Sequence, residues 1–168
     1  MAPPVFKTGL AGIALAGGFD SLPPPPIFSD ANHTEVSMKV TRFHATPDGG
    51  SRFQDLEIPI NQPRPDNFGF TLHQSNAWPS PNIRFVQLPA GLDQSWHHAP
   101  ASQIVVVLSG AIEVGTSDGE KRRCSAGQAF IADDLTGQGH LTRVLDGPAH
   151  VMFVELPPNF DFTRWAPA

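Results

Sequence analysis

Residues 91–110 read GLDQSWHHAPASQIVVVLSG and decide the fold, because they join a histidine-bearing polar segment to a strongly apolar run. In an extended chain Gln103, Val105 and Val107 share one face, and the alternate residues share the other. Both faces are apolar apart from Gln103, which predicts a strand buried on both sides. A buried amide needs a partner, and a bound metal ion or a ligand hydroxyl would supply one.

Short segments of the same kind flank this run on both sides. They alternate polar with apolar residues, are rich in β-branched and aromatic side chains, and show no long helical period. We therefore expect strands over residues 36–43, 53–60, 82–91, 103–110, 111–117, 120–127, 129–134, 140–145 and 150–156. Glycine-containing turn signals at 47–50, 109–110, 117–120 and 146–148 separate several of them. The pattern predicts an all-β sandwich or closed barrel.

The first part of the chain has a different composition. Residues 1–34 lack a sustained period and contain a run of four prolines, which favours extended polyproline geometry. We expect an N-terminal arm over 1–34 and one barrel domain over 35–168. Residues 9–19 are uncharged but too short to cross a bilayer. A secretion signal there is the minority interpretation, because the run is weakly apolar and has no convincing cleavage site.

Composition limits the partners. The chain has 168 residues, 16% of them charged, and a net charge of −5, with no basic stripe to bind a polyanion. Neither nucleic acid nor a membrane is an expected partner. The single cysteine, Cys124, excludes an internal disulfide and fits a reducing compartment, so we expect a cytoplasmic protein. Nothing beside Cys124 in sequence would activate a thiol, so we expect a packing role.

The glycine and histidine spacing between Gly91 and Gly110 resembles the first cupin motif, G-x5-H-x-H-x3,4-E-x6-G, with Ala99 and Gln103 in place of the second His and the Glu. A looser second motif follows. Gly127 opens it, Asp133 takes the proline place, and His140 arrives two residues late. The resemblance to the cupin superfamily extends over about residues 36–156 and implies a double-stranded β-helix, or jelly-roll, barrel.

A narrower resemblance rests on the strings WHHAPASQIVVVLSG, TSDGEKRRCSAGQ and DDLTGQGH. They are similar to small single-domain cupins with a W-H-x-A-P-x-x-Q pattern, which occur in fungal aromatic polyketide clusters of the salicylaldehyde type and are described as oxidoreductases. This implies a small-molecule substrate and a divalent transition metal (Fe, Mn, Ni, Cu or Zn) held at the aligned positions His97, Gln103 and His140. One ligand and the carboxylate charge of the usual cupin set are missing.

Other residues are candidates for the same site. Asp134 closes a strand before the turn that delivers His140, so it is a candidate catalytic acid or base, whereas Asp133 fits turn chemistry. His98 is a second catalytic candidate, although residues adjacent in a strand point to opposite faces. The expected pocket walls are Trp96, Arg84, Phe130, Met152 and Phe153.

Three functions stay open at this stage. The first is a metal-dependent cupin enzyme, an oxidoreductase or else an isomerase or dehydratase, acting on an aromatic or polyketide-like molecule. The second is a metal-free catalyst or a small-molecule-binding module with a degenerate metal site. The third is a structural or regulatory oligomer. We also expect a homodimer in which the arm over 1–34 covers strand edges of the partner barrel.

Overall fold

The computed structural model describes residues 36–168, and these residues form an all-β domain with one short 3-10 helix. The N-terminal arm expected over 1–34 lies outside the described residues. The strands are β1 (Ser37–Ala45), β2 (Ser51–Pro59), β3 (Gln62–Pro65), β4 (Thr71–Gln74), β5 (Ile83–Leu88), β6 (Asp93–His97), β7 (Gln103–Ser109), β8 (Ala111–Gly115), β9 (Lys121–Ser125), β10 (Ala129–Asp133), β11 (His140–Val144), β12 (Ala149–Glu155) and β13 (Ala166–Pro167); the helix η1 is Phe162–Arg164.

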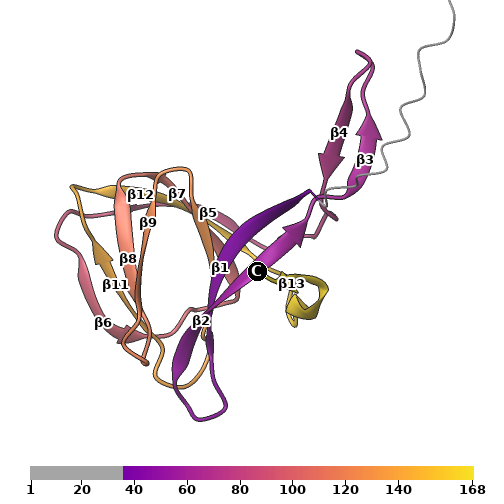
Figure 1. Cartoon of the computed structure of the whole chain (residues 1–168). Coiled ribbons are helices and arrows are strands. Elements are labelled where there is room, and N and C mark those ends of the chain that lie inside the picture. Colours follow the sequence, from indigo (N-terminus) through magenta and orange to yellow (C-terminus); the bar gives the residue numbers. More distant parts are fainter. Residues whose placement is uncertain (1–35) are drawn as a thin grey trace, which may run out of the picture. The chain divides into compact units, whose positions relative to one another are not determined.

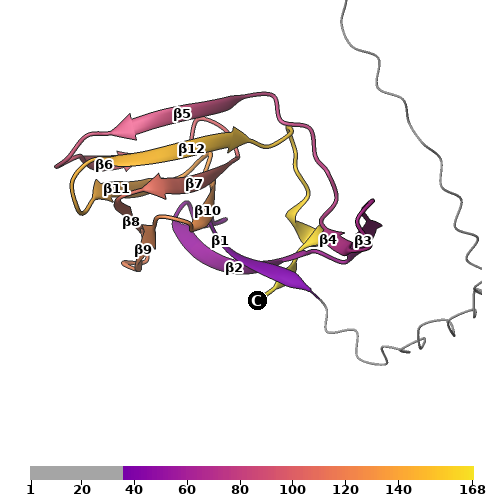
Figure 2. The ribbon, with the colours of Figure 1, turned by 90° about the horizontal axis from the view of Figure 1, so that it is seen from above.

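Two sheets build the barrel wall. One has seven strands in the order β13-β2-β1-β10-β7-β12-β5, and the other has four in the order β6-β11-β8-β9. Consecutive elements alternate between the sheets in several places, as in a jelly roll, and the pairing of β1 with β10 is parallel. Figures 1 and 2 show the two sheets enclosing a common interior. The strands β3 and β4 form a separate two-stranded sheet.

The seven-stranded sheet carries apolar side chains on both faces, and each face feeds a different cluster. Phe130 and Ala132 face the barrel interior, where they join Phe43 and Val107. Ile131, between them in sequence, is fully buried on the opposite face. There it packs in a cluster with Val40, Leu56, Ile58, Leu156 and Trp165, so the C-terminal segment covers this part of the outer face.

The predicted strands all occur, and the turn at residues 117–120 closes the β8–β9 hairpin with Gly119 at a φ of 90°. Three features differ from the sequence analysis. The strands β6 and β13 were not predicted. The β3–β4 hairpin was not predicted, and β7 is fully buried on one face only. Val106 on its other face is half-buried and Leu108 is 47% exposed, because the C-terminal segment covers β10 and β1 rather than this end of β7.

Within residues 36–168, no helix has the length and apolar character needed to cross a membrane.

Candidate functional site

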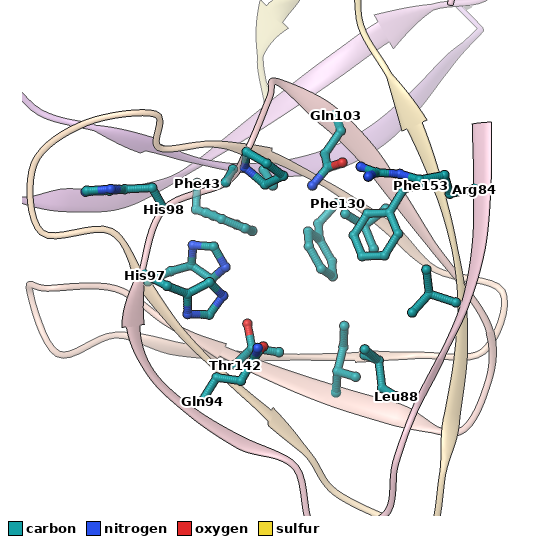
Figure 3. A pocket seen from close by; sticks show the side chains of 17 residues that line it. Phe43, Arg84, Leu88, Gln94, His97, His98, Gln103, Phe130, Thr142 and Phe153 are labelled. Carbon is teal, nitrogen blue, oxygen red and sulfur yellow. The ribbon is translucent and has the colours of Figure 1, made fainter. Parts of the chain in front are cut away.

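A cavity of about 280 Å³ opens into the barrel interior, and apolar side chains form most of its wall (Figure 3). Its lining residues are Phe43, Arg84, Val86, Leu88, Gln94, His97, His98, Ala99, Pro100, Gln103, Val105, Ile112, Phe130, Ala132, His140, Thr142 and Phe153. A concave, largely apolar site with a few polar groups is the usual form of a small-molecule pocket.

Two histidines lie side by side on the wall of this cavity. His97 ends β6, His140 begins β11, and the two are direct partners in the antiparallel pairing of these strands. Cross-strand partners project from the same face of a sheet. Their ring centroids are 4.2 Å apart, so both imidazoles can reach one bound atom or one proton. Phe43 packs against His140 from β1, with ring centroids 4.5 Å apart.

The tautomer of each imidazole is determined by its Nδ1 partner. Nδ1 of His97 donates to the backbone oxygen of Ser95 at 2.8 Å, and Nδ1 of His140 donates to Oδ2 of Asp134 at 2.7 Å. Both partners are acceptors, so each Nδ1 carries the proton and each Nε2 keeps a free lone pair. An imidazole whose second nitrogen donates to a carboxylate or a carbonyl is the usual form of a metal-ligating histidine.

Asp134 acts behind the site rather than in it. Its side chain is completely buried, it does not line the cavity, and its second oxygen accepts the backbone N–H of Ala99 at 3.3 Å. The carboxylate therefore connects the segment after β6 to the first residue of β11. Asp134 is a positioning residue for His140, which refines the predicted catalytic role.

Two glycines hold the turn that delivers His140. Gly137 and Gly139 have φ values of 77° and 80°, a region that favours glycine. A Cβ on Gly139 would lie 2.2 Å from the backbone oxygen of His97, so only glycine allows β11 to start this close to β6. Ser51 Oγ donates to the Gly139 oxygen at 2.6 Å and fixes the turn to β2. The local sequence thus positions the two imidazoles together.

Gln103 begins β7 on the cavity wall and is only 4% exposed. Among residues 36–168 its Oε1 finds no hydrogen-bond partner, and the sequence analysis expected this buried amide to need one. A buried acceptor without a donor is costly, so a bound species that supplies one or that coordinates the oxygen would be stabilised there. Figure 3 shows Gln103 between the side of the cavity that carries His97 and the side that carries Arg84 and Phe153.

Among the predicted pocket walls, Arg84, Phe130 and Phe153 line the cavity. Trp96 and Met152 do not, and this corrects the prediction for both. Each is the strand neighbour of a lining residue, His97 or Phe153, and neighbours in a strand point to opposite faces.

Two further predicted side chains sit at the periphery. His98 is exposed, its Nε2 contacts the backbone oxygen of Gly137, and Figure 3 shows its ring directed away from the centre of the cavity. Asp133 forms an ion pair with Arg42, whose Nε donates to it at 2.9 Å. The His98 contact stabilises the turn that contains Gly137, and the Asp133–Arg42 ion pair connects β10 to β1.

Sequence reasoning missed several cavity residues, among them Phe43, Gln94 and Thr142. Thr142 follows His140 by two positions and so shares its face, a signal the sequence did contain. Gln94 faces inward because the register between β6 and β11 shifts between the pairs at His140 and Thr142. Such an irregularity has no sequence signature here. Phe43 required knowledge that β1 lies beside β10.

No family model matches the chain, and no curated protein matches it either. Several solved structures are similar. A conserved protein of unknown function from Streptococcus pyogenes shares 25% identity over 45% of this chain, with a TM-score of 0.36, and the chain covers 63% of that protein, which is less than two thirds.

Two others are cupin domains. The cupin-2 domain of an XRE-family transcriptional regulator from Enterobacter cloacae is 26% identical over 45% of this chain and 80% of its own length, with a TM-score of 0.33. The cupin domain of Cnp3 from Schizosaccharomyces pombe is 13% identical over 77% of this chain and 88% of its own, with a TM-score of 0.40. The strand order by itself defines the fold as an all-β barrel of two sheets.

Proposed function

We propose that this chain is a small-molecule enzyme of the cupin fold that holds a divalent transition metal at His97, His140 and Gln103. The observation that carries the proposal is the pair of neighbouring imidazoles, each with Nδ1 donating to an acceptor and Nε2 left free. Two neutral imidazoles with ring centroids 4.2 Å apart are close enough for both to ligate one metal ion or to share one proton.

The residues present fit such an ion in part. Neutral imidazole suits Fe, Ni, Cu and Zn, and the unpaired Oε1 of Gln103 offers a third, harder donor. All three donors are neutral, and within residues 36–168 no group of three or more His, Cys, Asp or Glu side chains is arranged to hold a metal. We therefore expect weaker binding than at a site with a carboxylate ligand. When bound, the ion would supply Lewis acidity or activate oxygen.

The chain's own residues would bind and orient the substrate. Phe43, Phe130 and Phe153 line the cavity from three strands and offer ring faces to a flat apolar molecule. The cavity is at the small end of the range for ligand sites, about 300–1,000 Å³. These features support an aromatic or polyketide-like substrate of modest size. With open coordination positions at the ion, they support an oxidoreductase, or else an isomerase or dehydratase.

Metal titration of the purified protein tests this function. Incubation with each of Fe, Mn, Ni, Cu and Zn, followed by desalting and elemental analysis, should give close to one ion per chain for at least one of them. His97→Ala and His140→Gln should each lose most of it. His150→Ala is the matched control, because this histidine is exposed and outside the cavity, where its Nδ1 contacts Ser109 Oγ. Well under one ion per chain for all five metals would refute the metal site.

A metal-free enzyme is the second candidate, and the absence of a carboxylate among the aligned ligands favours it. In that case Nε2 of His140 would take a proton from the substrate, and the buried Asp134 carboxylate would stabilise the resulting imidazolium. Turnover of an identified substrate that survives chelator but falls in Asp134→Asn would select this mechanism over the first.

A further inference from the structure

The cavity carries a charge opposite in sign to that of the protein. The chain has a net charge of −5, yet the lining residues include one permanent cation, Arg84, and no Asp or Glu. The histidines that line the cavity are either neutral or, when protonated, positive, so they add no negative charge. Arg84 is exposed, so water partly screens its charge, but its guanidinium can reach a ligand whose apolar part lies against the cavity wall.

In the described part of the chain, Arg84 lacks the carboxylate partner that several arginines of the barrel have, and it shares this with Arg52 of β2, which does not line the cavity. Arg42 pairs with Asp133, Arg122 with Asp55 and Arg143 with Glu113, whereas no ion pair within residues 36–168 involves Arg84. Its guanidinium carbon lies 6.0 Å from the ring centre of Phe153, its strand partner in the β5–β12 pairing. Figure 3 shows the two side chains together on the side of the cavity across from His97.

A guanidinium has five donors in a planar fork and binds a carboxylate through two parallel hydrogen bonds. An aromatic ring beside it can pack against a ring attached to that carboxylate. We infer that the cavity takes aromatic carboxylic acids, with the carboxylate on Arg84 and the ring among the phenylalanines. This inference rests on the proposed small-molecule function and names its substrate class.

The charge argument also predicts coupling to the metal. A divalent ion held only by neutral donors, in a cavity that already contains a cation, gains from an anionic ligand nearby. The acid and the ion should therefore each increase the affinity for the other, and by the same factor.

Calorimetric titration with benzoate and its neutral isostere benzamide tests the inference, using metal-free protein so that failure of the metal site cannot affect the result. The wild type should bind benzoate about tenfold or more tightly than benzamide, since the charge-assisted pair contributes only to benzoate. Arg84→Gln should abolish this preference, and Arg84→Lys should keep part of it.

Arg143→Gln is the matched control, since Arg143 is an exposed arginine outside the cavity. It should leave the preference unchanged, and circular dichroism should show that every variant is folded. Equal affinity of the wild type for both ligands, no binding of either at millimolar concentration, or an unchanged preference in Arg84→Gln would each overturn the inference.

A second inference rests on a different region, the β3–β4 hairpin. All eight residues of its two strands are exposed, and among the strands of residues 36–168 these two pair only with each other (Figure 1). Near its turn Phe68, Phe70 and Leu72 are 85%, 67% and 52% exposed. An isolated two-stranded hairpin is marginally stable in water, so these side chains need a surface to pack against.

The same chain offers such a surface. Strand β5 is the free edge of the seven-stranded sheet, and its Ile83 and Phe85 are 58% and 72% exposed. We propose that the hairpin of each chain docks on β5 of a second copy, in a reciprocal twofold arrangement. Covering these five side chains on both copies would bury on the order of 1,300 Å², which reaches the range of stable specific interfaces.

Light scattering after size-exclusion chromatography tests the docking. The wild type should be a dimer at micromolar concentration, and both Phe68→Ser with Phe70→Ser and the single Phe85→Ser should be monomers. Leu135→Ser is the control, because Leu135 is an equally unpacked side chain, 47% exposed, that belongs to neither surface. A monomeric wild type, or a dimer that persists in the double variant, would overturn the proposal.

Discussion

Strand β1 and the β3–β4 hairpin both carry phenylalanine near alternating polar residues, yet they place it in opposite environments. Phe43 in β1 is 1% exposed and contacts three other rings, whereas Phe68 at the hairpin turn is 85% exposed. The barrel has an interior that β1 faces, and the hairpin has no second layer. Residue type and alternation therefore identify a strand, but a neighbouring layer determines which side chains stabilise the fold.

The largest expected effect separates these two phenylalanines. Phe43→Ala should lower the free energy of unfolding by about 3–5 kcal/mol, because it removes a fully buried ring and leaves a cavity beside Phe53 and Phe130. Phe68→Ala should change it by less than about 0.5 kcal/mol. Urea denaturation at a concentration low enough for the chain to be monomeric measures both. Equal effects would mean that the hairpin packs on its own barrel.

Two glycines with similar backbone angles extend the comparison. Gly139 in the barrel and Gly69 in the hairpin have φ values of 80° and 91°. A Cβ on Gly139 would strike the His97 backbone, but one on Gly69 would meet nothing within 4 Å. Gly139→Ala should cost about 2–4 kcal/mol, from backbone strain plus overpacking, and Gly69→Ala about 1–2 kcal/mol, from strain alone.

Thermal unfolding of the two glycine variants measures this difference. Gly139→Ala should also weaken metal uptake, since it separates the strand ends that carry the two histidines. Similar midpoints for both variants would show that the close approach of β11 to β6 relaxes without cost.

Sequence reasoning reached the parts of the structure that depend on local patterns. Alternation predicted most of the barrel strands, although not β6, and motif spacing indicated His97, Gln103 and His140, which all line one cavity. Sequence reasoning failed where a feature depends on which strands pair or pack against each other in the fold. The hairpin was missed because Pro63 and Pro65 interrupt β3 and argue against a strand, although proline is tolerated where no ladder partner needs its N–H.

The same limit explains the errors at the site. Trp96 and Met152 have the composition of pocket walls, but strand parity directs them outward. The role of Asp134 behind His140 could not be read from the sequence, because it depends on the side-chain contact between the end of β10 and the start of β11. Residue types suggest which chemistry is possible, and only the pairing of strands shows which groups meet.

Two aspartates provide a smaller and more specific test. Asp134 accepts hydrogen bonds from His140 and from the Ala99 backbone, and Asp66 in the hairpin accepts them from the backbones of Phe68 and Phe70. Asp134→Ala leaves buried donors unpaired and should cost about 1–3 kcal/mol. Asp66→Ala exposes its donors to water and should cost about 0.5 kcal/mol or less.

Proton NMR of the imidazoles measures the tautomer of His140, which would not change if Asp134 only stabilised the fold. Loss of the Asp134 acceptor should let His140 exchange between tautomers, while His97, which donates to a backbone oxygen, keeps its own. If the His140 tautomer is unchanged in Asp134→Ala, then Asp134 does not position the imidazole.

The last prediction concerns the rate at which the Cys124 thiol reacts, a measurement that requires no change in the free energy of unfolding. Cys124 is 8% exposed, and burial raises the pKa of its thiol to about 11. Only the thiolate reacts, so alkylation by iodoacetamide at pH 8 should be about a hundredfold slower than in the unfolded chain and should accelerate as the pH approaches 11.

A double variant moves the thiol to the hairpin. In Cys124→Ala with Leu72→Cys, the only thiol lies on the hairpin. It should react at an ordinary rate in dilute protein and become protected as the concentration rises into the dimer range, whereas Cys124 in the wild type should be protected at every concentration. A hairpin thiol that reacts equally fast at all concentrations would contradict the docking on a second copy, and fast labelling of Cys124 at pH 8 would contradict its place in the barrel core.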